Sequence, residues 1–397
     1  MKINHYLLFI FMFLCCAVVA QEQEISARYF DPQTPVAYPK RAGNIILETR
    51  NPLQLPTVDG YLVLKCDFHM HTVFSDGSVW PTTRVEEAFR EGLDVISITD
   101  HLEFHHLHEP DVNAKNLNRE YEIAKGLSDQ LGVLLIPGAE VTREVPAGHF
   151  NVLFLNDANL LEKFINYENH YDPSNLTETL QAAQELGCFI FWNHPSYQHP
   201  EGIAEWYDIH EQLYQKGLIM GLEVANSNMY IPLVQKWAEE KKLTMFSNSD
   251  FHNSVSMPEG CYRPMTLVFA KDRSSESIRE ALLNRKTIAF AQNYLYGEKS
   301  LVNGLFHNSL KTRCLSSNDK QTIVEISNQS GLPYDLELIE NDSFIPNTKH
   351  ILLYGNKTIA VVLSNKSGKP MHKGNFKVHV NNIYPSASLV LQTEISY

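Results

Sequence analysis

The sequence has few cysteines, and it has fewer basic than acidic side chains. Cysteines number 6 in 397 residues, none of them in a Cys-x-x-Cys spacing, which argues against a cysteine-based metal site. Cys66 and Cys188 fall in apolar, strand-like runs and are expected to be small buried residues. The 33 Lys and Arg stand against 46 Asp and Glu, a formal net charge of -13. This balance argues against a protein that coats nucleic acid, because such a protein needs a basic surface, and it suits a site where carboxylates surround cations.

Apolar runs of comfortable membrane-spanning length are missing as well. Leu7–Val19 is apolar but too short, and Lys2 supplies a positive charge before it. Small residues end this stretch, so we predict a signal peptide at residues 1–20 and an exported bacterial protein, periplasmic or secreted. An uncleaved anchor and lipidation at Cys15 or Cys16 stay open, although the large residues before these cysteines disfavour lipidation. No membrane span is expected after cleavage.

Between Tyr61 and Tyr294, apolar runs alternate with helix-like stretches. Runs this apolar and β-branched are typical of parallel strands that are buried on both faces. The runs are Tyr61–Phe68, Val95–Thr99, Val133–Ala139, Phe150–Leu155, Cys188–Phe191, Ile219–Val224 and Leu243–Phe246. The helical stretches are Pro81–Glu91 (with Val85, Ala88 and Phe89 on one face), Ser174–Leu186, Ala204–Lys216, Tyr230–Lys242 and Ser275–Asn284. Seven strands alternating with helices predict a closed or nearly closed parallel barrel over residues 58–298, after a proline-containing linker at 21–57.

From residue 299 onward the pattern changes to short strands without a convincing helix. Gly, Asn and Ser turns separate the strands, which is typical of an antiparallel β-sandwich. The strand candidates are Lys320–Glu325, Asp335–Ile339, His350–Tyr354, Thr358–Leu363, Asn375–His379 and Ser388–Gln392. We therefore predict a small all-β, Ig-like sandwich domain over residues 299–397. Its role is left open between dimerisation, cell-surface association, gating of the substrate and covering of apolar barrel surface.

Histidines and carboxylates follow the ends of nearly all the predicted barrel strands. His69 and His71 stand two apart at the end of the first strand, so both point to the same side. A single His-x-His is a weak signal, and each later residue could be a turn residue, a helix cap or a solvated side chain. The joint pattern favours a metal site, because the carboxyl ends of barrel strands meet on one face. The candidate metal ligands are His69, His71, Asp76, His101, Glu140, His149, His194, Asp250 and His252.

Seven short motifs, in this order, resemble those of the polymerase and histidinol phosphatase (PHP) superfamily of metal-dependent phosphoesterases. They are His-x-His at His69–His71, Ser-Asp-Gly at Ser75–Gly77, Thr-Asp-His at Thr99–His101, Gly-x-Glu at Gly138–Glu140, His-x-Asn at His149–Asn151, Asn-His-Pro at Asn193–Pro195 and Ser-Asp-x-His at Ser249–His252. The resemblance covers about residues 61–290. It implies an α/β fold, a distorted (β/α)7 TIM-like barrel with a three-metal centre, and it does not extend to the C-terminal β domain.

The resemblance also implies which residues share each of three divalent transition-metal ions. One metal would take His69, His71, Glu140 and Asp250; a second Glu140, His149 and His194; a third Asp76, His101 and His252. Many relatives have a histidine where Asp76 stands, so the third site is where this chain departs from them. Histidine and carboxylate ligands without thiolate suit zinc, manganese or iron, and the sequence does not rank these metals.

The chemistry expected of such a centre assigns further roles. Metal ions about 3.5–4 Å apart can hold a bridging hydroxide, which would attack a phosphorus whose charge the metals offset. Glu140 and Asp250 are catalytic candidates as metal ligands, and Asp250 could also receive a proton. Asp100 is a candidate partner of His101 or a proton shuttle, or alternatively a turn aspartate. Arg143, and secondly Arg263, are candidates to bind phosphate oxygens, the alternative being a solvated surface arginine.

Two other polar sets lie near the predicted strand ends. Glu223 and Asn226 end the sixth strand and could support ligands or make structural hydrogen bonds. His105, His106 and His108 follow the second strand and are expected on an exposed loop at the rim, outside the central site.

We expect an exported metal-dependent phosphoesterase. The signal peptide and added β domain favour a phosphodiesterase acting on small phosphate diesters, a choice made by analogy of architecture. Alternatives are a phosphomonoesterase of the histidinol-phosphate or nucleotide phosphatase type, an amidohydrolase, and a non-catalytic metal- or surface-binding protein. An amidohydrolase is disfavoured because no lysine ends strands three to five. The expected partner is a small phosphate ester, with no stable nucleic-acid partner, and a homo-oligomer is left open.

Overall fold

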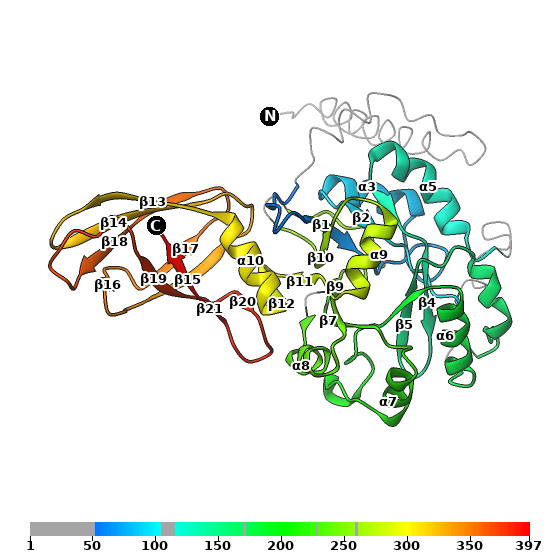
Figure 1. The fold of residues 1–397 in the computed structure, drawn as a ribbon. Helices are drawn as coiled ribbons and strands as arrows, with labels where there is room; N and C mark the ends of the chain where they lie inside the picture. Colours follow the sequence, from blue (N-terminus) through cyan, green and yellow to red (C-terminus); the bar gives the residue numbers. More distant parts are fainter. Residues whose placement is uncertain (1–51, 105–115, 170–171, 228, 259–260) are drawn as a thin grey trace, which may run out of the picture. The chain divides into compact units, whose positions relative to one another are not determined.

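The computed structural model describes residues 52–104, 116–169, 172–227, 229–258 and 261–397. The predicted signal peptide, the two cysteines considered for lipidation, most of the predicted linker and the His105–His108 cluster lie outside these residues. Among the residues described, no helix combines the length and the apolar character needed to cross a membrane. Figure 1 shows a mixed α/β domain, coloured from blue to light green, and a β-rich domain coloured from yellow to red.

One sheet of the α/β domain is 7-stranded. Its order is β20 (Ile383–Tyr384), β12 (Tyr294–Gly297), β11 (Thr287–Ala291), β10 (Met265–Ala270), β1 (Leu62–Asp67), β2 (Val95–Ile96) and β3 (Leu134–Leu135). Strands β1, β2 and β3 are parallel, whereas β10, β11 and β12 extend the sheet from β1 in antiparallel pairs. The predicted runs did not include β10 to β12, although β10 is a continuous apolar run of the kind that forms a buried strand.

The other sheet of this domain is 6-stranded. Its order is β4 (Gly138–Thr142), β5 (His149–Leu153), β6 (Phe189–Trp192), β7 (Gly221–Asn226) and β8 (Met229–Tyr230), with β9 (Thr244–Asn248) also paired to β7. Strands β6, β7 and β9 are parallel, but β4 pairs with β5 and β5 with β6 in the antiparallel sense. The barrel is therefore mixed rather than all-parallel. The loop that joins β4 to β5 is too short for the crossover that a parallel pair requires.

Isolated backbone bridges join the two sheets at the end where the predicted ligands lie. Met70 pairs with Phe251, and His101 pairs with Glu140, both in the parallel sense. Each bridge includes a predicted ligand or lies beside one. The ring of strands is thus closed by the ligand segments themselves, and the distorted barrel expected from the sequence is confirmed.

Helices surround the sheets (Figure 1). They are α3 (Pro81–Arg90), α5 (Arg119–Leu131), α6 (Leu176–Glu185), α7 (Asp208–Gln215), α8 (Pro232–Lys241) and α9 (Ser275–Leu283), with 3-10 turns η2 (Ala158–Phe164) and η3 (Pro200–Gly202). Helix α3 begins at Pro81, where no intrahelical hydrogen bond is lost, and buries the predicted face of Val85, Ala88 and Phe89. Helix α5 was not predicted, although its acidic first turn and its Gly132 C-cap are helix signals.

Aromatic rings fill the barrel interior beneath the ligand end. Phe246 on β9 is fully buried and stacks on Phe191 with ring centroids 4.3 Å apart. Phe68 at the end of β1 meets the same ring edge-on at 6.0 Å. Gly221 on β7 allows this packing, because a Cβ there would lie 2.5 Å from the Phe246 ring. The residues that follow these strands are therefore placed by a rigid core.

The second domain is a sandwich of two 4-stranded sheets. One has the order β13 (Leu310–Ser317), β14 (Gln321–Asn328), β18 (Thr358–Asn365) and β16 (Phe344–Pro346), and the other β17 (His350–Leu353), β15 (Tyr334–Ile339), β19 (Asn375–Val380) and β21 (Leu391–Ser396). The expectation that no helix follows residue 299 is wrong. Helix α10 (Lys299–Ser309) leads into β13 and buries Val302, Leu305 and Phe306, a spacing that marks one helical face.

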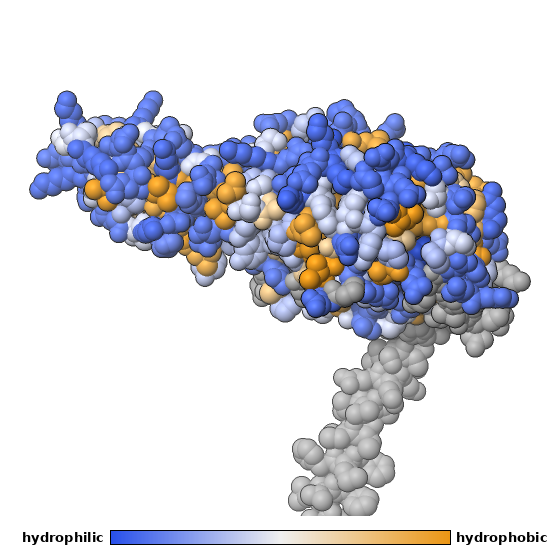
Figure 2. Space-filling model, turned by 90° about the horizontal axis from the view of Figure 1, so that it is seen from below, coloured by the Kyte–Doolittle hydropathy of each residue, from blue (hydrophilic) through white to orange (hydrophobic). Residues whose placement is uncertain are grey.

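The cysteines of the described residues are all free. Cys66 and Cys188 are buried, as predicted, and Cys261 is exposed. Figure 2 shows a largely hydrophilic surface on one face, on which the hydrophobic patches are separate from one another. Isolated patches of this kind are normal on a soluble surface.

Candidate metal centre

The residues that follow β1 and β9, together with the central residue of β4, bring four donor atoms together. The Nε2 atoms of His69 and His71 are 3.1 Å apart. Glu140 Oε2 lies 2.9 and 3.2 Å from them, and Asp250 Oδ1 lies 3.2 and 3.1 Å from them. A tetrahedral site with metal–ligand distances of about 2.0–2.2 Å spaces its ligands about 3.3–3.6 Å apart. These four residues are here called the inner group, and five of the six separations between their donor atoms are close to that spacing.

The ring of His69 is held in one orientation by Glu223. His69 Nδ1 lies 2.9 Å from the acceptor Glu223 Oε1, so Nδ1 carries a proton, and Nε2 is the nitrogen that would bind a metal ion in the inner group. Glu223 also accepts hydrogen bonds from the side chains of Asn248 (2.8 Å) and Asn226 (2.9 Å) and from the N–H of His194 (2.8 Å). A carboxylate that fixes a histidine in this way is a common support of metal ligands.

The inner group gathers more negative charge than a buried site holds without a counter-charge. Burial opposes the charged form of His69, but Asp250, Glu223 and Glu140 together raise its pKa well above the ordinary value. Burial would also raise the pKa of Glu140, yet His101 and His69 hold it well below its usual range. The charge must therefore be balanced by protons or by metal cations, which is the electrostatic condition of a metal site.

Glu140 also belongs to a second set of donors. Its Oε1 lies 2.9 Å from His149 Nδ1 and 3.7 Å from His194 Nε2, and these three residues are here called the middle group. Glu140 Oε1 and both ring nitrogens of His149 are buried without a hydrogen-bond partner. Burial lowers the pKa of His149 to about 4, so its ring is neutral and can act as a ligand. Such unsatisfied atoms are rare in native proteins, and a cation between Glu140 Oε1 and His149 Nδ1 would satisfy these two.

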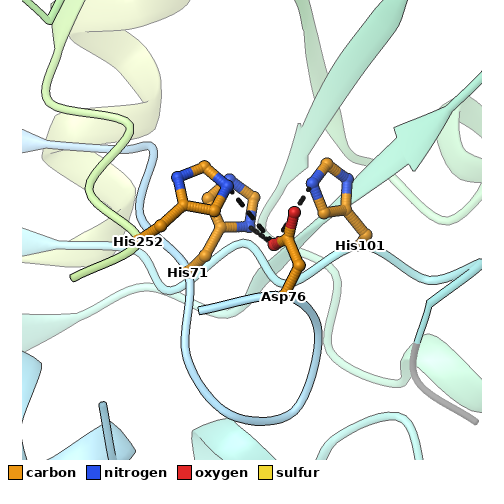
Figure 3. A group of neighbouring side chains, drawn as sticks. All are labelled: His71, Asp76, His101 and His252. Atoms are coloured by element: carbon orange, nitrogen blue, oxygen red, sulfur yellow. Dashed lines mark ion pairs between the residues drawn. The ribbon is translucent and has the colours of Figure 1, made fainter. Parts of the chain in front are cut away.

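The third set of donors surrounds Asp76 and is here called the outer group. Asp76 Oδ1 lies 3.3 Å from His252 Nε2 and 3.6 Å from His101 Nε2 (Figure 3). The ring of His71 stacks on those of His252 and His101, at 4.2 and 4.5 Å. Burial opposes the charge of Asp76, but its contacts with His101 and His252 hold its pKa far below the ordinary value. The side chains of Asp76 and His252 are 39% and 35% exposed, so this group faces the solvent.

All the predicted metal ligands therefore meet in one place. Donor atoms within 4.8 Å of one another form overlapping groups, namely His71, Asp76, His101 and His252; His69, His71 and Asp250; His69, Glu140 and His194; and His101, Glu140 and His149. The donors are imidazole nitrogens and carboxylate oxygens, a combination that fits zinc, manganese or iron.

Asp100 lies beside these groups but is bound to a loop. Its Oδ1 accepts hydrogen bonds from Thr72 N–H at 2.6 Å and from Ser75 Oγ at 2.5 Å, and its Oδ2 accepts one from Thr72 Oγ1 at 2.5 Å. These contacts shape the loop between His71 and Asp76, as the turn-aspartate alternative expects. Its role as a proton shuttle stays a prediction.

The two arginines predicted to bind phosphate are buried in ion pairs. Arg143 donates to Glu103 and to the carbonyl of Thr142. Arg263 donates to Glu91 at 2.5 Å and to Asp67 at 3.0 Å. Neither is the solvated surface arginine of the alternative interpretation. Because a buried guanidinium needs a carboxylate partner, these pairs explain the burial, and phosphate binding by either residue stays a prediction.

Two supporting residues escaped the sequence prediction. Asp67 accepts a hydrogen bond from the N–H of His69, and Thr142 places its hydroxyl 2.5 Å from Nδ1 of His101. Each lies two positions from a ligand in sequence, Asp67 before His69 and Thr142 after Glu140. Every second residue of a strand shares one side, so this spacing is a signal that could have found both.

Known structures include one with this two-domain organisation. A two-domain protein from Bacteroides vulgatus ATCC 8482, described as containing a predicted PHP-like metal-dependent phosphoesterase, is 36% identical over 88% of this chain and 99% of its own, with a TM-score of 0.78. An amidohydrolase from Chromobacterium violaceum with bound sulfate is 16% identical over 50% of this chain and 93% of its own, with a TM-score of 0.35. That likeness is too weak to bear on activity.

The family model of an Ig-like domain matches residues 309–396, and no curated protein matches the chain.

Proposed function

The chain belongs to the PHP-like metal-dependent phosphoesterases, and from this premise we propose that it is an exported phosphodiesterase of small phosphate diesters with three divalent metal ions. The observation that carries the proposal is the position of Glu140. One of its oxygens completes the inner group, and the other faces His149 in the middle group. A single carboxylate thus links two donor sets, as a site that acts on one phosphate with neighbouring cations requires.

The donor sets define how the cations would be held. The inner group would hold one through His69, His71, Glu140 and Asp250, the middle group one through Glu140, His149 and His194, and the outer group one through Asp76, His101 and His252. Bound cations would lower the pKa of a water molecule and offset the charge that develops on the phosphate. The exposed side of the outer group gives an ester access to the centre.

The organic part of the ester has an aromatic neighbour. Tyr197 is 52% exposed, and its ring centroid lies 4.9 Å from that of His194 and 5.7 Å from that of His149. A hydrogen bond of 2.8 Å from Tyr197 N–H to the carbonyl of His194 fixes it in a turn. The backbone of this residue is thus fixed next to the metal ligands, and its exposed ring could contact the leaving group.

The charge around the site supports a diester over a monoester. A diester carries a single negative charge, whereas a monoester carries about −1.5 to −2 at neutral pH. The buried arginines Arg84, Arg143 and Arg263 are all paired with carboxylates. They therefore contribute little net positive charge to offset the second negative charge of a monoester. An amidohydrolase activity has no comparable support.

The test is a substrate panel with metal-reconstituted protein. We expect faster hydrolysis of bis-p-nitrophenyl phosphate than of p-nitrophenyl phosphate, and no hydrolysis of amides or lactones. His194→Ala should lose the activity, whereas His379→Ala in the sandwich domain should keep it. Hydrolysis of the monoester alone would overturn the diesterase assignment. Hydrolysis of amides or lactones without phosphate-ester cleavage would overturn the phosphoesterase activity for this chain.

A further inference from the structure

A fully buried arginine outside every predicted motif contacts two of the chain segments that carry the inner and outer groups, those of His71 and His252. Arg84 lies on α3 and has no exposed surface. Its Nε donates to the carbonyl of His71 at 2.9 Å, and its two terminal nitrogens donate to the carbonyls of Phe251 at 2.7 Å and Asn253 at 3.0 Å. One guanidinium therefore holds the backbone of His71 and the backbone on both sides of His252.

Glu87, one turn along α3, completes this arrangement. Its Oε2 accepts from Arg84 at 2.8 Å, and it is also fully buried. Its Oε1 accepts from the N–H of Val255 at 2.8 Å and from the hydroxyl of Ser254 at 3.3 Å. The pair thus neutralises its own charge and binds the segment 251–255 at both of its ends.

The geometry of the guanidinium matters more than its charge. Three of its N–H directions are used on three separate carbonyls, and a fourth contact reaches Glu87. A planar fork with fixed N–H directions can satisfy these acceptors together, whereas the ammonium of a lysine is a compact point charge. Replacement by lysine would therefore keep the charge and lose the alignment.

The outer group depends on this alignment more than the inner group does. Asp250 is held independently, because its N–H donates to the carbonyl of His69 at 2.8 Å and the N–H of Ser249 donates to Asp67 at 3.1 Å. The segment of His252 is joined to His71 by the contacts of Arg84 and by a backbone hydrogen bond from the N–H of His71 to the carbonyl of Phe251 at 3.0 Å. Nδ1 of His252 bonds to the carbonyl of Asp250 within the same segment, and its own carbonyl accepts from the N–H of Ser78.

We propose that Arg84, together with Glu87, is a positioning residue that sets the spacing between the inner and outer groups and thereby the affinity of the outer group for its cation. The inference rests on the metal centre proposed above. A shift of the segment 251–253 relative to His71 would change the 3.3 Å separation of His252 Nε2 and Asp76 Oδ1, while the inner group keeps its spacing.

The experiment is a titration of the metal-free protein with Co²⁺, followed by visible absorption. Asp76→Asn identifies the phase that belongs to the outer group, since that phase should be lost in this variant. Arg84→Met should weaken this phase about 10–100-fold, the range typical of residues that support ligands, and leave the inner phase within twofold of wild type. Arg84→Lys should weaken the same phase. Arg273→Met, an exposed arginine paired with Asp94, is the matched control and should bind Co²⁺ as wild type does.

A second measurement separates positioning from folding. Millimolar guanidinium added to Arg84→Ala should restore the outer phase, whereas the same concentration of ammonium should not. The proposal would be overturned if folded Arg84→Met bound Co²⁺ as wild type does. It would also be overturned if Arg84→Lys weakened all phases equally and guanidinium did not rescue Arg84→Ala. If Arg84→Met does not fold, the Co²⁺ titration of Arg84→Lys and the guanidinium rescue of Arg84→Ala test the proposal. A wild-type protein that binds no Co²⁺ would instead reject the metal centre itself.

Discussion

The inner and outer groups meet at His71, an inner residue whose ring stacks on those of His101 and His252 of the outer group, yet the surroundings of the two groups differ. The inner donors are separated by 2.9–3.2 Å, and His69, His71 and Glu140 are fully buried. The outer donors are 3.3 and 3.6 Å from Asp76 Oδ1, and two of the three side chains are more than a third exposed. The comparison indicates that one end of the centre is formed in advance, whereas the other is open to solvent and substrate.

The difference follows from the elements that carry the donors. His69 and Asp250 follow strands next to the aromatic core, and Glu140 lies within β4, where it is paired with Asn151 of β5. Asp76 lies on a loop shaped by Asp100, and His252 lies on a segment attached through Arg84. Loops need such added contacts because they lack the backbone ladder that orders a strand.

The largest effect should come from the residue that the inner and middle groups share. Glu140→Gln removes the negative charge between them and leaves one amide nitrogen facing either His69 or His149. We expect kcat/KM for the diester to fall at least about 10³-fold, or about 4 kcal/mol of transition-state free energy. Metal analysis should show that the variant binds fewer ions. Glu144→Gln, an exposed neighbour, should match wild type. Full activity of Glu140→Gln would contradict a shared ligand.

Glu223→Gln should weaken the inner group while leaving its ligands in place. Each oxygen of Glu223 accepts hydrogen bonds, so an amide nitrogen on either side would face a donor. We expect zinc affinity of the inner group, measured by competition with a chelator, to fall about 10–100-fold. The outer group should keep its affinity. A uniform loss across all groups would show that Glu223 supports the fold rather than His69.

Asp76→His should change the metal preference of the outer group alone. Imidazole in place of carboxylate makes the donor set softer, which disfavours manganese relative to zinc. We expect the Mn²⁺ affinity of the outer group to fall about tenfold and its Zn²⁺ affinity to change less, in parallel titrations of wild type and variant. Equal losses for both metals would mean that geometry, not ligand type, limits this group.

The ligand positions could be predicted from the sequence because metal chemistry restricts the residue types and strand ends restrict the spacing. Glu223 could be foreseen for the same reason. Arg84 could not, because its partners are backbone carbonyls, two of which lie 167 and 169 positions away in the chain. Arg143, in contrast, was chosen for its position in the sequence, but its side chain lies in a buried ion pair. It stands three residues past Glu140, and alternation along a strand turns it to the other side, where it meets Glu103.

The sequence did not predict those features of the fold that depend on pairing between distant parts of the chain. The direction of β10 relative to β1 depends on the partner across the sheet, and the apolar pattern of β10 is the same for either direction. Helix α10 has a buried face of three residues, but it lies between two strand-rich regions that suggested an all-β domain. Local patterns thus fixed the type of most elements, and the sheet partners fixed their arrangement.

The smallest effect concerns a histidine behind the middle group. Nδ1 of His210 accepts the N–H of Tyr207 at 3.1 Å, Nε2 donates to the carbonyl of Ala147 at 3.0 Å, and the ring stacks on Trp192 at 3.7 Å. Burial lowers its pKa to about 4, so folding favours the neutral ring. The unfolded chain takes up the proton near pH 6.5, and stability should therefore fall as the pH drops from about 6.5 toward 4.

Between pH 6.5 and 5.5 this histidine should account for about 1 kcal/mol of the unfolding free energy. Urea titrations of metal-free wild type and His210→Gln should show the smaller pH slope in the variant. Metal-free protein is used so that metal release does not contribute. His379→Gln should retain the wild-type slope. Equal slopes in wild type and His210→Gln would mean that the ring takes up its proton without unfolding, and that the turn before His149 is less rigid than the strand ends that carry the inner group.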